Sequence, residues 1–108
     1  MPIQRVLVVD DDSFSREFLT EAAKSLGLET TSCSNGEAAL AHARSNPVDI
    51  VFTDLRMPGM SGVDLVRAMT TEFPETPVVL VTAHGTVETA VEAMKLGAVD
   101  FLVKPCTP

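Results

Sequence analysis

The chain has 108 residues, of which 45% are hydrophobic, and these values predict one globular domain with a single core. Its 15 acidic and 8 basic residues give a net charge of −7, which argues against direct binding of nucleic acid or an anionic membrane. No apolar run is long enough to span a bilayer, and the N-terminus leads into a predicted strand without a signal peptide, so a cytoplasmic location is expected.

Five short apolar segments predict strands. The first and fourth are continuous apolar runs, as expected of strands buried on both faces, whereas the second is more polar and predicts an edge strand. The segments are residues 6–9, 29–33, 49–53, 78–81 and 99–103. Cys33, at the end of the second, and Cys106 lack metal-binding spacing, so we expect reduced thiols rather than a disulfide.

Four helices are predicted between the strands. The residues expected to begin them are Ser13, Asn35, Ser61 and Thr86, and Gly27 and Gly97 are expected to end the first and the fourth. Apolar residues of the first helix recur at helical spacing, at Phe14, Phe18, Leu19, Ala22 and Leu26. The residues expected to face inward are Val63, Leu65, Val66 and Met69 in the third helix, and Val87, Ala90, Val91 and Met94 in the fourth.

Strands and helices therefore alternate along the whole chain. This order predicts an α/β fold, a doubly wound five-stranded parallel sheet with right-handed crossovers and helices on both faces. Such a sheet needs a helix over its last strand, but only four residues follow Lys104, so the fifth helix is expected to be missing from this chain.

Each predicted strand but the second ends in a charged or hydroxyl group. Asp10 and Asp11 follow the first strand, Asp54 the third, Thr82 the fourth and Lys104 the fifth. In an open parallel sheet, these carboxyl ends share one edge, where ligands bind. Two carboxylates about 4 Å apart repel each other by roughly 4 kcal/mol at an effective dielectric near 20, so the cluster needs a proton or a cation.

Oxygen ligands of this kind suit Mg²⁺, and an aspartate can itself attack a phosphoryl group to give an aspartyl phosphate. Lys104 could pair with Asp54 when the site is empty and with phosphate when it is filled, and Thr82 offers a hydroxyl donor. The set therefore predicts a site that accepts a phosphoryl group on Asp54. The structural alternative, a turn or N-cap residue, is strong for Asp12, moderate for Asp10 and weak for Asp54.

The chain resembles a receiver domain of a bacterial two-component response regulator, nearest to receivers of nitrogen-regulator-type transcriptional regulators. The matching motifs are VVDDDS at residues 8–13, TDLRMPGMSG at 53–62, VTA at 81–83 and DFLVKP at 100–105. The resemblance covers residues 1–108 as one receiver domain and implies the flavodoxin-like strand order 2-1-3-4-5. It also implies phosphorelay signalling: a sensor histidine kinase phosphorylates the receiver, which switches a surface that controls an output domain or downstream protein, expected to act in transcription.

The resemblance also assigns roles to individual residues. Asp54 is the expected phosphoacceptor, and the expected ligands of Mg²⁺ or Mn²⁺ are Asp10, Asp11, Asp54 and the backbone carbonyl of Arg56. Thr82 and Lys104 would bind phosphoryl oxygens, and such a domain catalyses only its own phosphorylation and dephosphorylation. The Lys104–Pro105 peptide is usually cis in the family, although sequence alone leaves both isomers open.

Phosphorylation adds about −1.5 to −2 charges. Thr82 would move toward the phosphoryl group, Phe101 would rotate inward, and the surface around the fourth helix would change. Phe101 lacks the hydroxyl of the tyrosine that many relatives carry, so this switch would act by packing alone. Arg56 and His84 would flank the path of a hydrolytic water and tune the lifetime of the phosphorylated state; simple solvent exposure is an equal alternative.

Without the fifth helix, apolar side chains of the first and fifth strands would be uncovered. A truncated chain of this kind is expected to dimerise, to exchange elements between copies, or to be only marginally stable. Three other classes remain as alternatives: a haloacid-dehalogenase-type phosphatase, which Phe14 disfavours; a calcium-binding loop at residues 10–14, which lacks the required glycine; and a degenerate receiver serving only as an interaction module.

Overall fold

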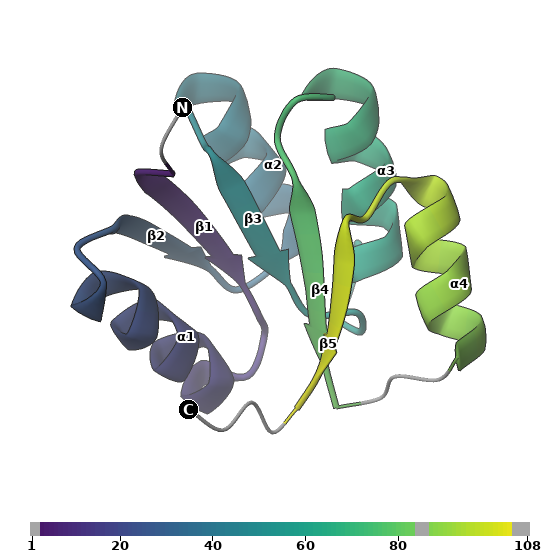
Figure 1. Ribbon diagram of the computed structural model, residues 1–108, viewed down its shortest axis with the longest axis horizontal. Helices are drawn as coiled ribbons and strands as arrows, with labels where there is room; N and C mark the ends of the chain where they lie inside the picture. The colour runs from purple at the N-terminus through teal and green to yellow at the C-terminus, as the bar shows by residue number, and fades with distance from the viewer. Residues whose placement is uncertain (1–2, 84–86, 105–108) are drawn as a thin grey trace.

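The computed structural model describes residues 3–83 and 87–104 (Figure 1). Its strands are β1 (Arg5–Val9), β2 (Glu29–Cys33), β3 (Ile50–Thr53), β4 (Val78–Thr82) and β5 (Asp100–Val103). Its helices are α1 (Ser13–Ser25), α2 (Gly36–Ser45), α3 (Gly62–Glu72) and α4 (Val87–Leu96). The strands form one parallel sheet in the order β2-β1-β3-β4-β5, which confirms the predicted topology.

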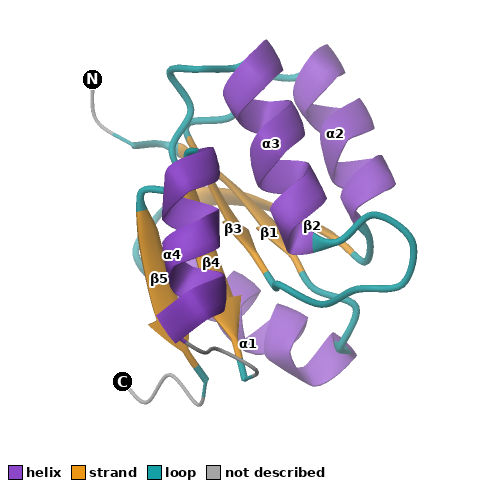
Figure 2. Ribbon diagram, turned by 90° about the vertical axis from the view of Figure 1, so that its right-hand side faces the viewer, coloured by secondary structure: helices purple, strands orange, loops and turns teal. Residues whose placement is uncertain are grey.

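The helices cover the two faces of the sheet unequally. α1 lies against one face, and α2 and α3 lie on the other, where α4 packs beside α3 (Figures 1 and 2). The main core lies between the sheet and the α2–α3 layer, and its fully buried members include Leu7, Val51, Leu80, Leu65 and Met69. Burial of these side chains drives the packing that holds the strand ends in place.

The N-cap of the helix that follows β1 lies one residue earlier than predicted. Asp12, not Ser13, is the N-cap of α1: its Oδ2 accepts a hydrogen bond of 3.0 Å from the backbone nitrogen of Ser15. Asp12 has extended backbone angles, whereas Ser13 is already helical, and a cap must lie outside the helix. The apolar spacing of α1 does not produce a buried stripe throughout, because Phe14 is 78% exposed and Leu26 77% exposed.

The predicted inward face of α4 is wrong where it can be compared. Val91 and Met94 are exposed, whereas Ala93 is fully buried and its neighbours at helical spacing, Thr89 and Leu96, are partly buried. Large apolar residues lie on both sides of this helix, so hydrophobicity alone does not select the face that packs. The inward residues predicted in α3 agree, with Leu65, Val66 and Met69 buried and Val63 partly buried.

β2 has the predicted bounds, and the other strands begin or end one residue from their predicted positions. β3 begins at Ile50 rather than at residue 49, although the backbone nitrogen of Asp49 still donates to the Arg5 carbonyl at 2.9 Å. The Asp49 side chain accepts hydrogen bonds from the backbone nitrogens of Gln4 and Arg5, at 2.9 and 2.8 Å. Asn35 and Ser61 cap α2 and α3 as predicted. Gly27 and Gly97 follow their helices with positive φ, a conformation in which glycine avoids the steric cost of a Cβ atom.

Candidate functional site

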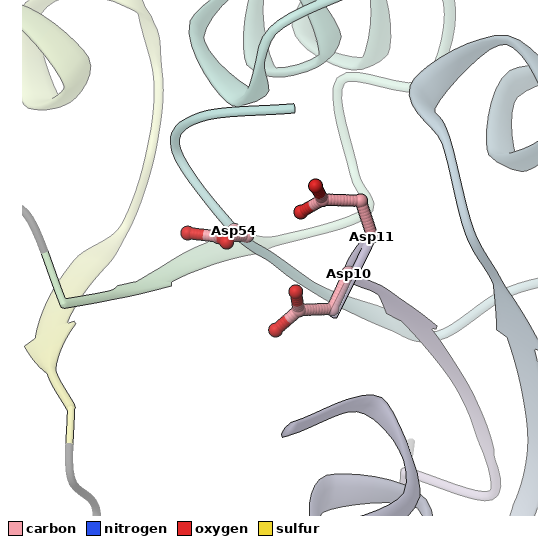
Figure 3. Close-up of side chains that lie close together, drawn as sticks. All are labelled: Asp10, Asp11 and Asp54. Atoms are coloured by element: carbon pink, nitrogen blue, oxygen red, sulfur yellow. The ribbon is translucent and has the colours of Figure 1, made fainter. Parts of the chain in front are cut away.

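Three carboxylates meet at the carboxyl edge of the sheet. Asp10 and Asp11 follow β1, and Asp54 follows β3; because Val9 is in register with Thr53 on the neighbouring strand, the two strand ends are adjacent. Figure 3 shows the three side chains around a common space, and one oxygen from each lies within 4.8 Å of the others. Asp10 is 1% exposed and Asp54 8%, whereas Asp11 is open to solvent.

Lys104, from the far end of the chain, reaches this cluster. Its Nζ lies 2.6 Å from Oδ2 of Asp10 and 3.5 Å from Oδ2 of Asp54. We predicted pairing with Asp54 when the site is empty; the structure places Lys104 in contact with both carboxylates, with Asp10 as the nearer partner. A flexible four-carbon stem lets the ammonium group settle between two negative charges.

Burial and charge shift the protonation equilibria of this pair. The pKa of Asp10 is raised above its ordinary value, mainly because the carboxyl group is buried. Hydrogen bonds from Lys104 and Asp12 lower this pKa, whereas the charge of Asp54 raises it further. Burial lowers the pKa of Lys104, but its hydrogen bond with Asp10 and the charges of Asp54 and Asp10 outweigh this, so the net shift is upward. Lys104 is therefore held as a cation among the carboxylates.

Backbone groups fix the orientation of the two buried carboxylates. The nitrogen of Asp12 donates to Oδ1 of Asp10 at 2.9 Å, and the nitrogen of Leu55 donates to Oδ1 of Asp54 at 2.7 Å. Each carboxylate thus has one oxygen held by the chain and Oδ2 directed toward Lys104. Asp54 is thereby presented in a set orientation.

The ends of β4 and β5 supply the remaining predicted groups. Thr82 is fully buried at the end of β4, and its carbonyl accepts a hydrogen bond of 2.8 Å from the backbone nitrogen of Lys104. Phe101 is partly buried in β5 and packs against the core. Arg56 is exposed in the loop that follows Asp54. His84, Pro105 and Cys106 lie outside the described residues, so their predicted roles and states stay predictions.

Two features of the site escaped sequence reasoning. The Arg16 guanidinium donates from Nη1 to the backbone oxygen of Asp10 at 2.7 Å, and no spacing rule marks this contact. At Gly62, which follows the predicted cap Ser61, an added Cβ would collide with the backbone oxygen of Asp54. The glycine itself could have indicated this contact, because close approach of another backbone segment is one of the few reasons for glycine inside a helix.

The donor set fits a hard divalent cation. All three side chains of the cluster offer carboxylate oxygens, with neither sulfur nor imidazole among them, and the open side at Asp11 leaves room for water. Carboxylate oxygens together with waters are the ligands of Mg²⁺ and Mn²⁺, so the residues present suit either ion.

A family model for the response regulator receiver domain matches residues 6–108. The chain belongs to this family. The acidic cluster of this receiver domain is typical of the phosphorylation site of two-component regulators. None of the helices within residues 3–83 and 87–104 has the length and apolar character needed to cross a membrane.

Curated relatives of the receiver domain include response regulators and a DNA-binding transcriptional regulator. It is 41% identical over 105 residues to the response regulator protein PilR of Pseudomonas aeruginosa, covering 97% of this chain and 24% of PilR. It is 42% identical over 100 residues to the DNA-binding transcriptional regulator NtrC of Salmonella typhimurium, covering 93% of this chain and 21% of NtrC. The predicted likeness to nitrogen-regulator receivers is confirmed, and the chain spans less than a quarter of the length of these relatives.

Solved structures of other receivers have the same fold. The chemotaxis protein CheY4 of Vibrio cholerae superposes with a TM-score of 0.91 at 31% identity, over 99% of this chain and 91% of that one. A response regulator receiver protein from Pseudomonas putida superposes with a TM-score of 0.89 at 36% identity, over 97% of this chain and 88% of that one.

Proposed function

We propose that Asp54 accepts a phosphoryl group from a sensor histidine kinase in a metal-dependent reaction. The observation that carries this proposal is the position of Asp54: it lies within 4.8 Å of Asp10 and Asp11 and 3.5 Å from Lys104. A carboxylate between metal ligands and a lysine is placed to attack an anionic phosphoryl group whose charge its neighbours neutralise.

The transfer exchanges one bond to phosphorus for another. A carboxylate oxygen of Asp54 forms the new O–P bond while the P–N bond to the kinase histidine breaks and its electron pair returns to the imidazole. Oδ1 of Asp54 is held by the nitrogen of Leu55, so Oδ2, which faces Lys104, is the oxygen we assign to the attack. Lys104 and Thr82 bind the phosphoryl oxygens, and the chain catalyses only its own phosphorylation and dephosphorylation.

Asp10, Asp11, Asp54 and the backbone carbonyl of Arg56 would hold Mg²⁺, with Mn²⁺ as a substitute. When bound, the ion supplies positive charge that draws in the phosphoryl group and neutralises the charge that develops during transfer. Arg56 and His84 would set how quickly water removes the phosphoryl group from Asp54.

The signal would leave the site through Thr82 and Phe101. A phosphoryl group on Asp54 draws the Thr82 hydroxyl toward it, and Phe101, which is only partly buried, turns further into the core. The surface formed by α4 and β5 would then change for an output domain or a downstream protein. The likeness to NtrC supports a transcriptional output, and a cytoplasmic location fits this partnership.

The direct test is intact mass after incubation with a small acyl phosphate and Mg²⁺. We expect a gain of one phosphoryl group that disappears when the metal is chelated and that is absent from Asp54→Asn. Circular dichroism verifies that the variant is folded. A folded wild-type chain that gains no phosphoryl group, or an Asp54→Asn variant that still gains one, would contradict the proposal.

A further inference from the structure

Arg16 makes a contact that links α1 to the backbone of the acidic cluster. It is the fourth residue of α1 and is partly buried, and its Nη1 donates to the backbone oxygen of Asp10 at 2.7 Å. Helical side chains lean toward the N-terminus of their helix, which allows Arg16 to reach back six residues. A charged donor on a carbonyl makes a stronger hydrogen bond than a neutral one.

The Asp10 carbonyl belongs to the peptide group that joins buried Asp10 to exposed Asp11. This group is planar, so holding its oxygen also restricts the nitrogen and the Cα atom of Asp11, from which the Asp11 side chain leaves the backbone. Asp10 has its own side-chain anchors in Asp12 and Lys104. Asp11 is exposed, and within the part of the chain that the structure describes no hydrogen bond to its carboxylate is seen.

The backbone of Arg16 holds the same segment. Its nitrogen donates to the backbone oxygen of Asp12 at 2.9 Å, and its own carbonyl accepts a hydrogen bond of 2.7 Å from the hydroxyl of Thr20. The guanidinium also lies close enough to Cys33 to oppose the rise that burial causes in the pKa of that thiol. Arg16 is therefore fixed at the junction of β1, α1 and the end of β2.

We propose that Arg16 is a positioning residue for the metal site: by holding the Asp10–Asp11 peptide group, it keeps the Asp11 carboxylate aimed at the cation shared with Asp10 and Asp54. This role rests on the proposed metal-dependent function. The positioning role and simple electrostatics predict opposite changes in Mg²⁺ affinity when Arg16 is replaced. Removing a positive charge near a cation site should strengthen cation binding. Losing the positioning contact should weaken it.

The test compares Mg²⁺ affinity among Arg16→Met, Arg16→Gln and Arg16→Lys, measured by calorimetric titration with Mg²⁺ alone. We expect Arg16→Met to lose about tenfold in affinity, the lower end of the range for groups that orient metal ligands, and Arg16→Lys to recover part of it. Arg67→Met is the matched control, because Arg67 is exposed on α3 and carries the same charge. It should bind Mg²⁺ as the wild type does.

A second readout needs no metal. The ¹⁵N chemical shift of the Asp11 amide reports on the hydrogen bond to the carbonyl of the same peptide group, so it should move in metal-free Arg16→Gln and Arg16→Met and stay in place in Arg67→Met. Thermal melting separates loss of fold from loss of position, and Arg16→Gln, which removes the charge but keeps a polar side chain, decides the question if Arg16→Met is unfolded.

The outcomes are distinct. Weaker Mg²⁺ binding in folded Arg16 variants, with a shifted Asp11 amide, supports the positioning role. Tighter or unchanged binding in Arg16→Gln and Arg16→Lys, or an unmoved Asp11 amide, overturns it while leaving the proposed function intact. A folded wild-type chain that binds no Mg²⁺ overturns the proposed function and the role of Arg16 together.

Discussion

Replacing Lys104 by methionine tests the charge balance of the site. The lysine ammonium lies 2.6 Å from Asp10, and the two side chains are 16% and 1% exposed. Removing one partner of a buried ion pair costs about 3–5 kcal/mol, because the other charge remains buried without compensation. Since Lys104 keeps some contact with solvent, we expect the lower end, about 3 kcal/mol, as the loss in free energy of unfolding without metal.

Mg²⁺ should reverse part of this loss. In the wild type, the cation must share Asp10 and Asp54 with Lys104, whereas in Lys104→Met it meets no competing positive charge. A tenfold gain in affinity would add about 1.4 kcal/mol of stability at saturating metal, relative to the gain of the wild type. Urea denaturation with a chelator and then with Mg²⁺ measures both values.

The control for this experiment is Lys24→Met, which removes an exposed lysine from α1. It should leave the Mg²⁺-dependent gain in stability at the wild-type value. Equal Mg²⁺-dependent gains in the wild type and Lys104→Met would refute the competition between lysine and metal, and an unchanged stability without metal would refute the electrostatic role of Lys104 itself.

Two further predictions concern the backbone and the pH dependence. Gly62→Ala should lose about 3 kcal/mol or more of stability and fail to gain a phosphoryl group, because its Cβ would collide with the Asp54 carbonyl. In Gly27→Ala the added Cβ meets nothing within 4 Å, but the residue must keep φ at +80°. This control should lose about 1–2 kcal/mol and still be phosphorylated. Chemical denaturation and intact mass check both, and equal losses would contradict the steric argument. The hydrogen bonds from Gln4 and Arg5 lower the pKa of Asp49 below 3.8, so its contribution to stability is present above that pH and is lost as the pH falls through the lower folded-state pKa. Asp49→Asn should therefore be less stable than the wild type at pH 7, and thermal melts below about pH 4 should show a smaller difference. A stability difference independent of pH would contradict the lowered pKa of Asp49.

The edge location of the site followed from the sequence because two simple patterns coincide. Apolar runs stop at charged or hydroxyl residues, and parallel strands place their carboxyl ends together. Asp10, Asp54, Thr82 and Lys104 could therefore be assigned to one edge before any coordinates were known. Their separations could not: Lys104 lies nearer to Asp10 than to Asp54 because a long flexible side chain selects its partner by local distances.

Other features depend on contacts that spacing does not encode. The buried face of α4 is set by Ala93, a small residue that permits close packing, and the larger Val91 and Met94 lie outside it. The contact between Arg16 and the Asp10 carbonyl depends on how α1 is rotated relative to the end of β1. A helical pattern predicts that α1 exists but leaves its rotation undetermined, because its apolar residues are partly exposed.

The contact between Asp10 and Lys104 joins residues 94 positions apart, so the site exists only when β5 is paired with β4. Lys104 gives the carboxylates that follow β1 and β3 a positive partner, and β5 is thereby held at its carboxyl end. A phosphoryl group on Asp54 would compete with Asp10 for this same ammonium. Phosphorylation would then act directly on the end of β5, two residues beyond Leu102 and three beyond Phe101, through charge as well as through the movement of Thr82. This second route would add to the packing switch expected for Phe101, which has no tyrosine hydroxyl.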